Sequence, residues 1–109
     1  MMRILMLNAV TRRERKDATS FVFDTVNDLG GWIDDVQMYS NLMNTIRLTL
    51  SAGAYPALVA ALREGGIAVD EPGTDLAGND PAAERMATLQ ITFIHDEPDM
   101  RRDVPAVPG

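Results

Sequence analysis

Four cations stand close together in an otherwise acidic chain and form the clearest candidate site for chemistry. Arg12, Arg13, Arg15 and Lys16 come directly before a segment that is expected to begin a helix. Backbone N–H groups at a helix N-terminus, together with guanidinium groups, suit a phosphate or carboxylate ligand. The cations also oppose the helix dipole, and such a local conflict is typical of functional sites. The candidate ligand-binding residues are Thr11, Arg12, Arg13, Arg15, Lys16 and Asp17. The alternative is a solvated loop whose charges offset those of neighbouring acids.

The only histidine, His95, is followed by Asp96 and Glu97. An imidazole beside carboxylates occurs in metal sites and in general-base catalysis. Adjacent residues of a strand point to opposite faces, however, so His95 and Asp96 do not converge while the strand continues. A histidine at a strand end with no ligand is the favoured interpretation. No metal site is predicted, because the acids lack calcium-loop spacing and the chain has no cysteine.

A second group of polar residues lies around an expected hairpin turn. Their amide and hydroxyl groups suit a ligand, but turns select the same residue types for bonding to their own backbone. The secondary candidates are Ser40, Asn41, Asn44, Arg47 and His95. Phosphate-binding loops, dinucleotide fingerprints, HExxH and GxSxG motifs are absent. No cofactor is therefore expected, and a non-enzymatic role is favoured.

The overall charge limits the classes of partner. The chain has 109 residues and a formal net charge of -6, which disfavours general nucleic-acid binding because phosphate contacts need a positive surface. No segment reaches the roughly 20 apolar residues of a membrane helix, and the N-terminus lacks the shape of a secretory signal. With no cysteine, the composition is compatible with a reducing compartment, and a cytoplasmic location is expected.

Two helices and a hairpin are expected to position the candidate residues. Apolar residues at helical spacing predict helices over 17–29, with Asp17 as a possible N-cap, and over 55–64, and a pair of glycines ends each. Between them, the runs 33–39 and 45–51 read as a hairpin, with a bulge or a late strand start at two aspartates. Further strands are expected over 3–11, 67–69 and 87–96.

This order predicts an α+β fold, a ferredoxin-like two-layer sandwich of the βαββαβ type. Its antiparallel sheet would carry both helices on one face. One domain is expected over 1–95, since 46% of the residues are hydrophobic and supply a single core. A mobile excursion is expected at about 70–86, because turn formers and acids are concentrated there. Residues 96–109, which include three prolines, are expected to form an extended or disordered tail.

The segments LGGWI and PALVAALREGGI, with the hairpin between them, resemble ACT domains, which are small regulatory domains with the ferredoxin-like sandwich. The resemblance covers roughly 3–69 and the last strand. It implies side-by-side homodimers and a small ligand, often an amino acid, bound where the first strand meets the first helix. At that junction the chain departs from the family, because residues 11–16 contain no glycine. No ligand contact is therefore carried over to a named residue.

Trp32 and the seven methionines are expected to pack inside the protein. An exposed Trp32 would instead indicate a partner-binding surface.

The sequence favours a non-catalytic regulatory or accessory domain that binds a small anionic metabolite or a protein partner. A homodimer is expected through the unpaired edge of strand 33–39. The alternative is a small dimeric enzyme with a pocket between sheet and helices, where Arg47 or His95 acts as the polar group.

Overall fold

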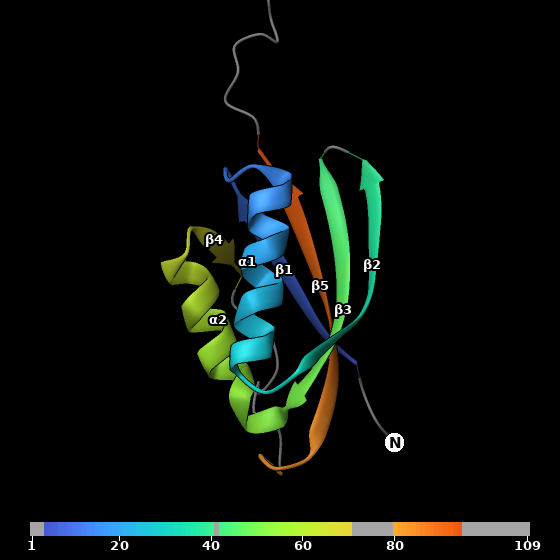
Figure 1. Cartoon of the computed structure of the whole chain (residues 1–109), viewed down its shortest axis with the longest axis vertical. Coiled ribbons are helices and arrows are strands. Elements are labelled where there is room, and N and C mark those ends of the chain that lie inside the picture. The colour runs from blue at the N-terminus through green and yellow to red at the C-terminus, as the bar shows by residue number, and fades with distance from the viewer. Residues whose placement is uncertain (1–3, 41, 71–79, 95–109) are drawn as a thin grey trace, which may run out of the picture.

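Two α-helices cover one face of a five-stranded mixed sheet (Figure 1). The computed structural model describes residues 4–40, 42–70 and 80–94, and an α+β fold is confirmed for them. The elements in chain order are β1 (Leu5–Thr11), α1 (Arg15–Asp28), β2 (Trp32–Ser40), β3 (Met43–Ser51), the 3-10 helix η1 (Ala52–Ala54), α2 (Tyr55–Glu64), β4 (Ile67–Val69) and β5 (Glu84–Phe93).

The strand order is β2-β3-β5-β1-β4, so β5 lies in the middle of the sheet. It pairs antiparallel with β3 and parallel with β1, while β4 pairs antiparallel with the outer edge of β1. The predicted all-antiparallel sheet is therefore wrong, and the ferredoxin-like strand order is not confirmed. The lengths of the strands give a physical reason. The ten residues of β5 satisfy backbone groups on both sides, whereas β4 has only three residues and occupies an edge.

The first helix begins two residues earlier than the sequence predicted. Glu14 is its N-cap, and the Glu14 carboxylate accepts a hydrogen bond from the backbone N–H of Asp17 at 3.0 Å. A carboxylate there complements the positive end of the helix dipole, so Asp17 is not the cap. The helix ends before Gly30, which has a φ of 84° and lets the chain turn toward β2.

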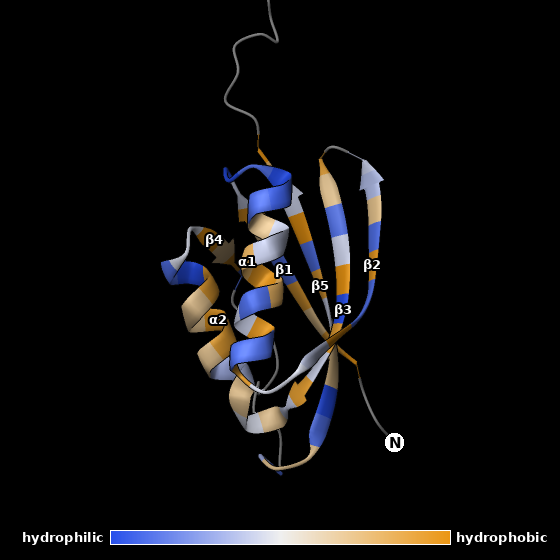
Figure 2. Ribbon diagram, in the orientation of Figure 1, coloured by the Kyte–Doolittle hydropathy of each residue, from blue (hydrophilic) through white to orange (hydrophobic). Residues whose placement is uncertain are grey.

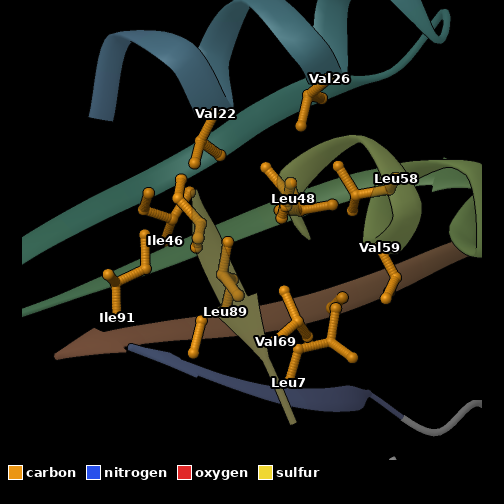
Figure 3. Close-up of a cluster of buried hydrophobic side chains, with 14 of the residues drawn as sticks. Leu7, Val22, Val26, Ile46, Leu48, Leu58, Val59, Val69, Leu89 and Ile91 are labelled. Carbon is orange, nitrogen blue, oxygen red and sulfur yellow. The ribbon is translucent and has the colours of Figure 1, made fainter. Parts of the chain in front are cut away.

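Apolar side chains alternate with polar ones along β3 and β5, as Figure 2 shows. The predicted inward sets are buried beneath the helices, namely Ile46, Leu48 and Leu50 of β3 and Leu89, Ile91 and Phe93 of β5. Figure 3 shows Val22 and Val26 of α1 pointing into this core from one side. The register of β2 against β3 shifts between Ile33 and Asp35, at the aspartates where a bulge or a late strand start was predicted. Because β2 begins at Trp32, the strand does not start late.

Some predictions fall at the limits of the described chain. Glu84–Met86 belong to β5, so the predicted excursion at 70–86 does not extend over them. Residues 71–79 and the predicted tail, 96–109, lie outside the described residues. Within the part of the chain that is described, no helix is long and apolar enough to cross a membrane.

Candidate functional site

The candidate anion site begins at Thr11, the last residue of β1. Thr11 is 3% exposed, and its hydroxyl donates to the carbonyl of Gly66 at 2.8 Å. The same oxygen accepts a hydrogen bond from the backbone N–H of Arg13 at 3.1 Å. Thr11 therefore fixes the segment before α1 against the turn that follows α2, and its hydroxyl is occupied by the protein's own backbone.

Arg13 joins the two helices. Its Nη1 donates to the carbonyl of Gly65 at the C-terminal end of α2 at 2.8 Å, and its Nε donates to Asp17 Oδ2 at 2.7 Å. The guanidinium also lies 4.6 Å from the centre of the Phe21 ring, a cation–π arrangement. The hydrogen bond between Arg13 and Asp17 raises the pKa of Arg13 and lowers the pKa of Asp17. Arg13 thus connects the segment before α1 to the end of α2. Its positive charge also neutralises the negative end of the α2 dipole.

The remaining cations of the segment differ in their exposure. Arg12 and Lys16 are exposed and Arg15 is half-buried, and both Arg12 and Arg15 take part in interactions of their own. The N-terminus of α1 is already capped by the Glu14 carboxylate. The structure therefore joins Thr11, Arg13 and Asp17 in one hydrogen-bonded network, in which Asp17 is exposed. The other three cations are exposed or partly buried.

The residues of the hairpin have separate roles. Ser40 Oγ accepts a hydrogen bond from the backbone N–H of Leu42 at 3.0 Å, the turn function expected of serine. Asn44 is fully buried beneath α1, where its Nδ2 donates to the Thr19 hydroxyl at 3.1 Å. Asn44 Oδ1 has no partner among the described residues, a deficit that costs about 1–3 kcal/mol. Asn41 and His95 lie outside the described residues.

A shallow groove lies between the helices, beside the Phe21 ring and Gly65 that Arg13 contacts. Its volume is about 400 Å³, and its walls come from both helices. The lining residues are Phe21, Thr25, Asp28, Leu29, Ala61, Glu64 and Gly65. Both ionisable groups in this lining, Asp28 and Glu64, are acids, so the groove repels an anionic ligand. No group of three or more His, Cys, Asp or Glu residues able to hold a metal is found within the described residues.

No described element covers the face of the sheet opposite the helices, and we call this face the open face. Strand alternation and register place its residues together. They are Ala68 of β4, Met6, Asn8 and Val10 of β1, Glu84, Met86, Thr88, Gln90 and Thr92 of β5, Met43, Thr45, Arg47, Thr49 and Ser51 of β3, and Trp32, Asp34, Asp35 and Gln37 of β2. Glu84, the first residue of β5, is the one charged side chain that β1 and β5 contribute to this list.

Trp32 stands at one end of the open face and is 45% exposed. Its indole Nε1 donates to Asp34 Oδ1 at 2.9 Å, and the hydroxyl of Thr49 donates to Asp34 Oδ2 at 2.6 Å. Asp34 thus connects Trp32 to Thr49 of β3, although nearly half of the surface of Trp32 remains in solvent. At the other end of β2, Tyr39 is 60% exposed and donates to Gln37 Oε1 at 2.8 Å. The expectation that Trp32 is a buried packing anchor is therefore wrong.

The methionines depart from the expectation in the same way. Met6, Met38, Met43 and Met86 are the described methionines, and the buried core contains none of them. Met6 and Met38 are 57% and 63% exposed. Three of the four, Met6, Met43 and Met86, lie on the open face. The core instead uses branched aliphatic residues, which suit the fixed spacing between sheet and helices.

Comparisons with protein-family models, with curated proteins and with solved structures found no match to this chain.

Proposed function

We propose that this protein is a non-catalytic regulatory or accessory module that acts by binding a protein partner on its open face. The composition of that face is the observation that supports this proposal. It combines an exposed tryptophan, three methionines and one arginine with no lysine. Its three acids, Asp34, Asp35 and Glu84, lie on the edge strand β2 and at the first residue of β5. A surface whose centre is poor in charge and which carries Trp, Met and Arg has the composition of the core of a protein–protein interface. Methionine side chains also adapt readily to a partner's surface.

An anionic metabolite is a weaker proposal for the same chain. Arg13 is held by Gly65 and Asp17, and the first turn of α1 is capped by Glu14. An anion would have to compete with these groups. The small-enzyme alternative receives no support either, since Arg47 lies on the open face rather than between sheet and helices.

Site-specific photo-cross-linking tests the proposal in extracts of cells that make the protein. A photoreactive phenylalanine replaces Thr88, at the centre of the open face, or Ala60, which is exposed on α2. We expect a discrete cross-linked protein from position 88 and none from position 60. Equal labelling from both positions would indicate random collisions and contradict a specific surface.

An NMR titration of the pure protein with inorganic phosphate and with pooled amino acids addresses the competing function. We expect no saturable shifts of the backbone amides at 11–17. Saturable shifts there, together with no cross-link from position 88, would replace the proposed function by metabolite binding.

A further inference from the structure

We infer that the partner on the open face is a second copy of this chain. Two sheets would then pack face to face about a two-fold axis, with the helices on the outside of a four-layer dimer. The inference rests on the proposed function and specifies its partner. Three properties of the open face carry it: its charge, its hydrogen-bonding groups and its size.

The charge of the molecule limits where two copies can meet. With a formal net charge of -6, two copies repel each other unless they meet on a surface poor in charge. The exposed surfaces of α1 and α2 carry charges along their length, among them Lys16, Asp24 and Glu64. On the open face the charged side chains are Asp34 and Asp35 of β2, Arg47 of β3 and Glu84 at the first residue of β5. The rest of β5 and all of β1 present neutral groups there. Two open faces can therefore approach without bringing like charges together at the centre.

The hydrogen-bonding groups of the open face are complementary to themselves. Asn8, Gln90, Thr45 and Gln37 are register neighbours and form one row across β1, β5, β3 and β2. Each amide or hydroxyl of this row is both a donor and an acceptor. A two-fold interface requires such self-complementarity, because the same surface patch is used on both sides. A row of carboxylates or of ammonium groups could not pair with its own copy.

The opposite charges on β2 and β3 fit the same arrangement. Asp35 and Arg47 are register neighbours on the open face. The guanidinium of Arg47 makes no hydrogen bond or ion pair with another residue of the described chain. Arg47 of one copy can thus face Asp35 of the other. Such a pair would fix how the two neutral rows align with each other.

The size of the open face meets the lower requirement for a stable dimer. The spacing between strands and the rise per residue give a face of roughly 24 by 25 Å. Its flat area is about 600 Å² per copy, and side chains that project from it add further surface. Specific interfaces bury about 1,200–2,000 Å² in total, so two such faces reach this range. The protruding Trp32 and Met6, 45% and 57% exposed, add apolar area to it.

Pairing along the edge of β2, which the sequence predicted, is the competing geometry. The register of β2 shifts between Ile33 and Asp35 and again between Met38 and Ser40. Bulges and charged residues on an edge strand are the usual protection against edge-to-edge pairing. The β2 edge therefore has both devices, whereas the middle of the open face, on β1 and β5, has neither.

Sedimentation velocity of the purified full chain over a range of concentrations tests the inference. We expect a concentration-dependent dimer of the 11.9 kDa chain. Gln90→Glu keeps the shape of the side chain at the centre of the face but adds a charge, and Asn27→Asp makes the same change on the exposed surface of α1. We expect Gln90→Glu to raise the dissociation constant at least about tenfold, because carboxylates would be desolvated next to each other. Asn27→Asp should leave the dissociation constant unchanged.

Three results would overturn the inference. A monomer at every concentration, with position 88 cross-linked to another protein, would reject the second copy and keep the proposed function. A monomer with no cross-link would reject both. A dimer that Gln90→Glu leaves intact but Met38→Glu weakens would place the contact at the β2 edge, where Met38 is 63% exposed.

Discussion

Arg13 shows how a charged side chain can serve the fold while resembling a ligand site. Its guanidinium makes three contacts, with the Gly65 carbonyl, the Asp17 carboxylate and the Phe21 ring. These contacts connect the start of α1 with the end of α2. The rigid planar fork of arginine suits this geometry, and a lysine would supply only one point charge.

We expect Arg13→Ala to lower the free energy of unfolding by about 1–2 kcal/mol, because the hydrogen bond to the Gly65 carbonyl and the contact with Phe21 are lost. Urea denaturation followed by circular dichroism measures the change. Lys16→Ala is the matched control, since Lys16 is exposed in the first turn of α1, three residues after Arg13. It should change stability by no more than about 0.5 kcal/mol. An equal loss in both variants would contradict the structural role of Arg13.

Tyr55 carries a second prediction at this scale. Its ring is fully buried, its hydroxyl donates to the Arg85 carbonyl at 2.6 Å, and burial raises its pKa to about 12. A tyrosine in the unfolded chain has a pKa of about 10. The folded state therefore holds this proton more tightly, so its contribution to stability is complete below about pH 10 and is lost as the pH rises toward about 12.

Measurements of the urea midpoint between about pH 9 and pH 12 should show this loss. Tyr55→Phe should be less stable at neutral pH and should show a smaller decline in the alkaline range. Tyr39, which is 60% exposed, provides a control, because Tyr39→Phe should leave the alkaline decline in place. An unchanged decline in Tyr55→Phe would assign it to other groups.

At the scale of the elements, the junction between α1 and β2 depends on two glycines with different requirements. A Cβ at Gly31 would collide with the Thr49 carbonyl and the Leu50 side chain. A Cβ at Gly30 would meet nothing within 4 Å, but the φ of Gly30 is 84°. Close approach of the backbone to β3 therefore explains Gly31, and a left-handed conformation explains Gly30.

We expect Gly30→Ala to cost about 1–2 kcal/mol, the usual penalty for a Cβ in the left-handed region. Gly31→Ala should cost more, because the Thr49 carbonyl belongs to a paired strand and cannot move alone. Thermal unfolding of both variants checks this order. Equal losses would mean that the collision at Gly31 is relieved by a shift of β2.

The sequence predicted the elements well because their signals are local. Alternation in β3 and β5 identified the buried faces, and the paired glycines marked the ends of both helices. The place of β5 in the sheet could not be predicted, because pairing between β1 and β5 depends on residues some 80 positions apart. The role of Arg13 was missed for the same reason, since its acceptor Gly65 comes from another element. Exposure of Trp32 and Met6 likewise depends on which face the helices leave uncovered.

At the scale of the whole molecule, the proposed dimer brings two acidic copies together. Repulsion between their net charges of -6 opposes association and weakens as salt screens it. We expect the dissociation constant to fall when the ionic strength rises from about 0.01 M to about 0.15 M, over which the Debye length shrinks from about 30 Å to about 8 Å. Sedimentation velocity at both salt concentrations measures this change. A dimer weakened by salt would indicate that ion pairs, rather than neutral rows, dominate the contact.

The position of β5 sets the order in which the protein can fold during its synthesis. The sheet consists of two strand pairs, β2 with β3 and β1 with β4, and β5 lies between them. Only β5 connects the two pairs by backbone hydrogen bonds, and it follows both of them in the chain. Until the ribosome has released residues up to about 93, the inner edges of β1 and β3 have no partner. Nascent chains on one messenger RNA would then expose strand edges to each other, a known route to non-native pairing. Completion of this sheet is therefore a late event, and chaperones that shield strand edges would act before β5 emerges.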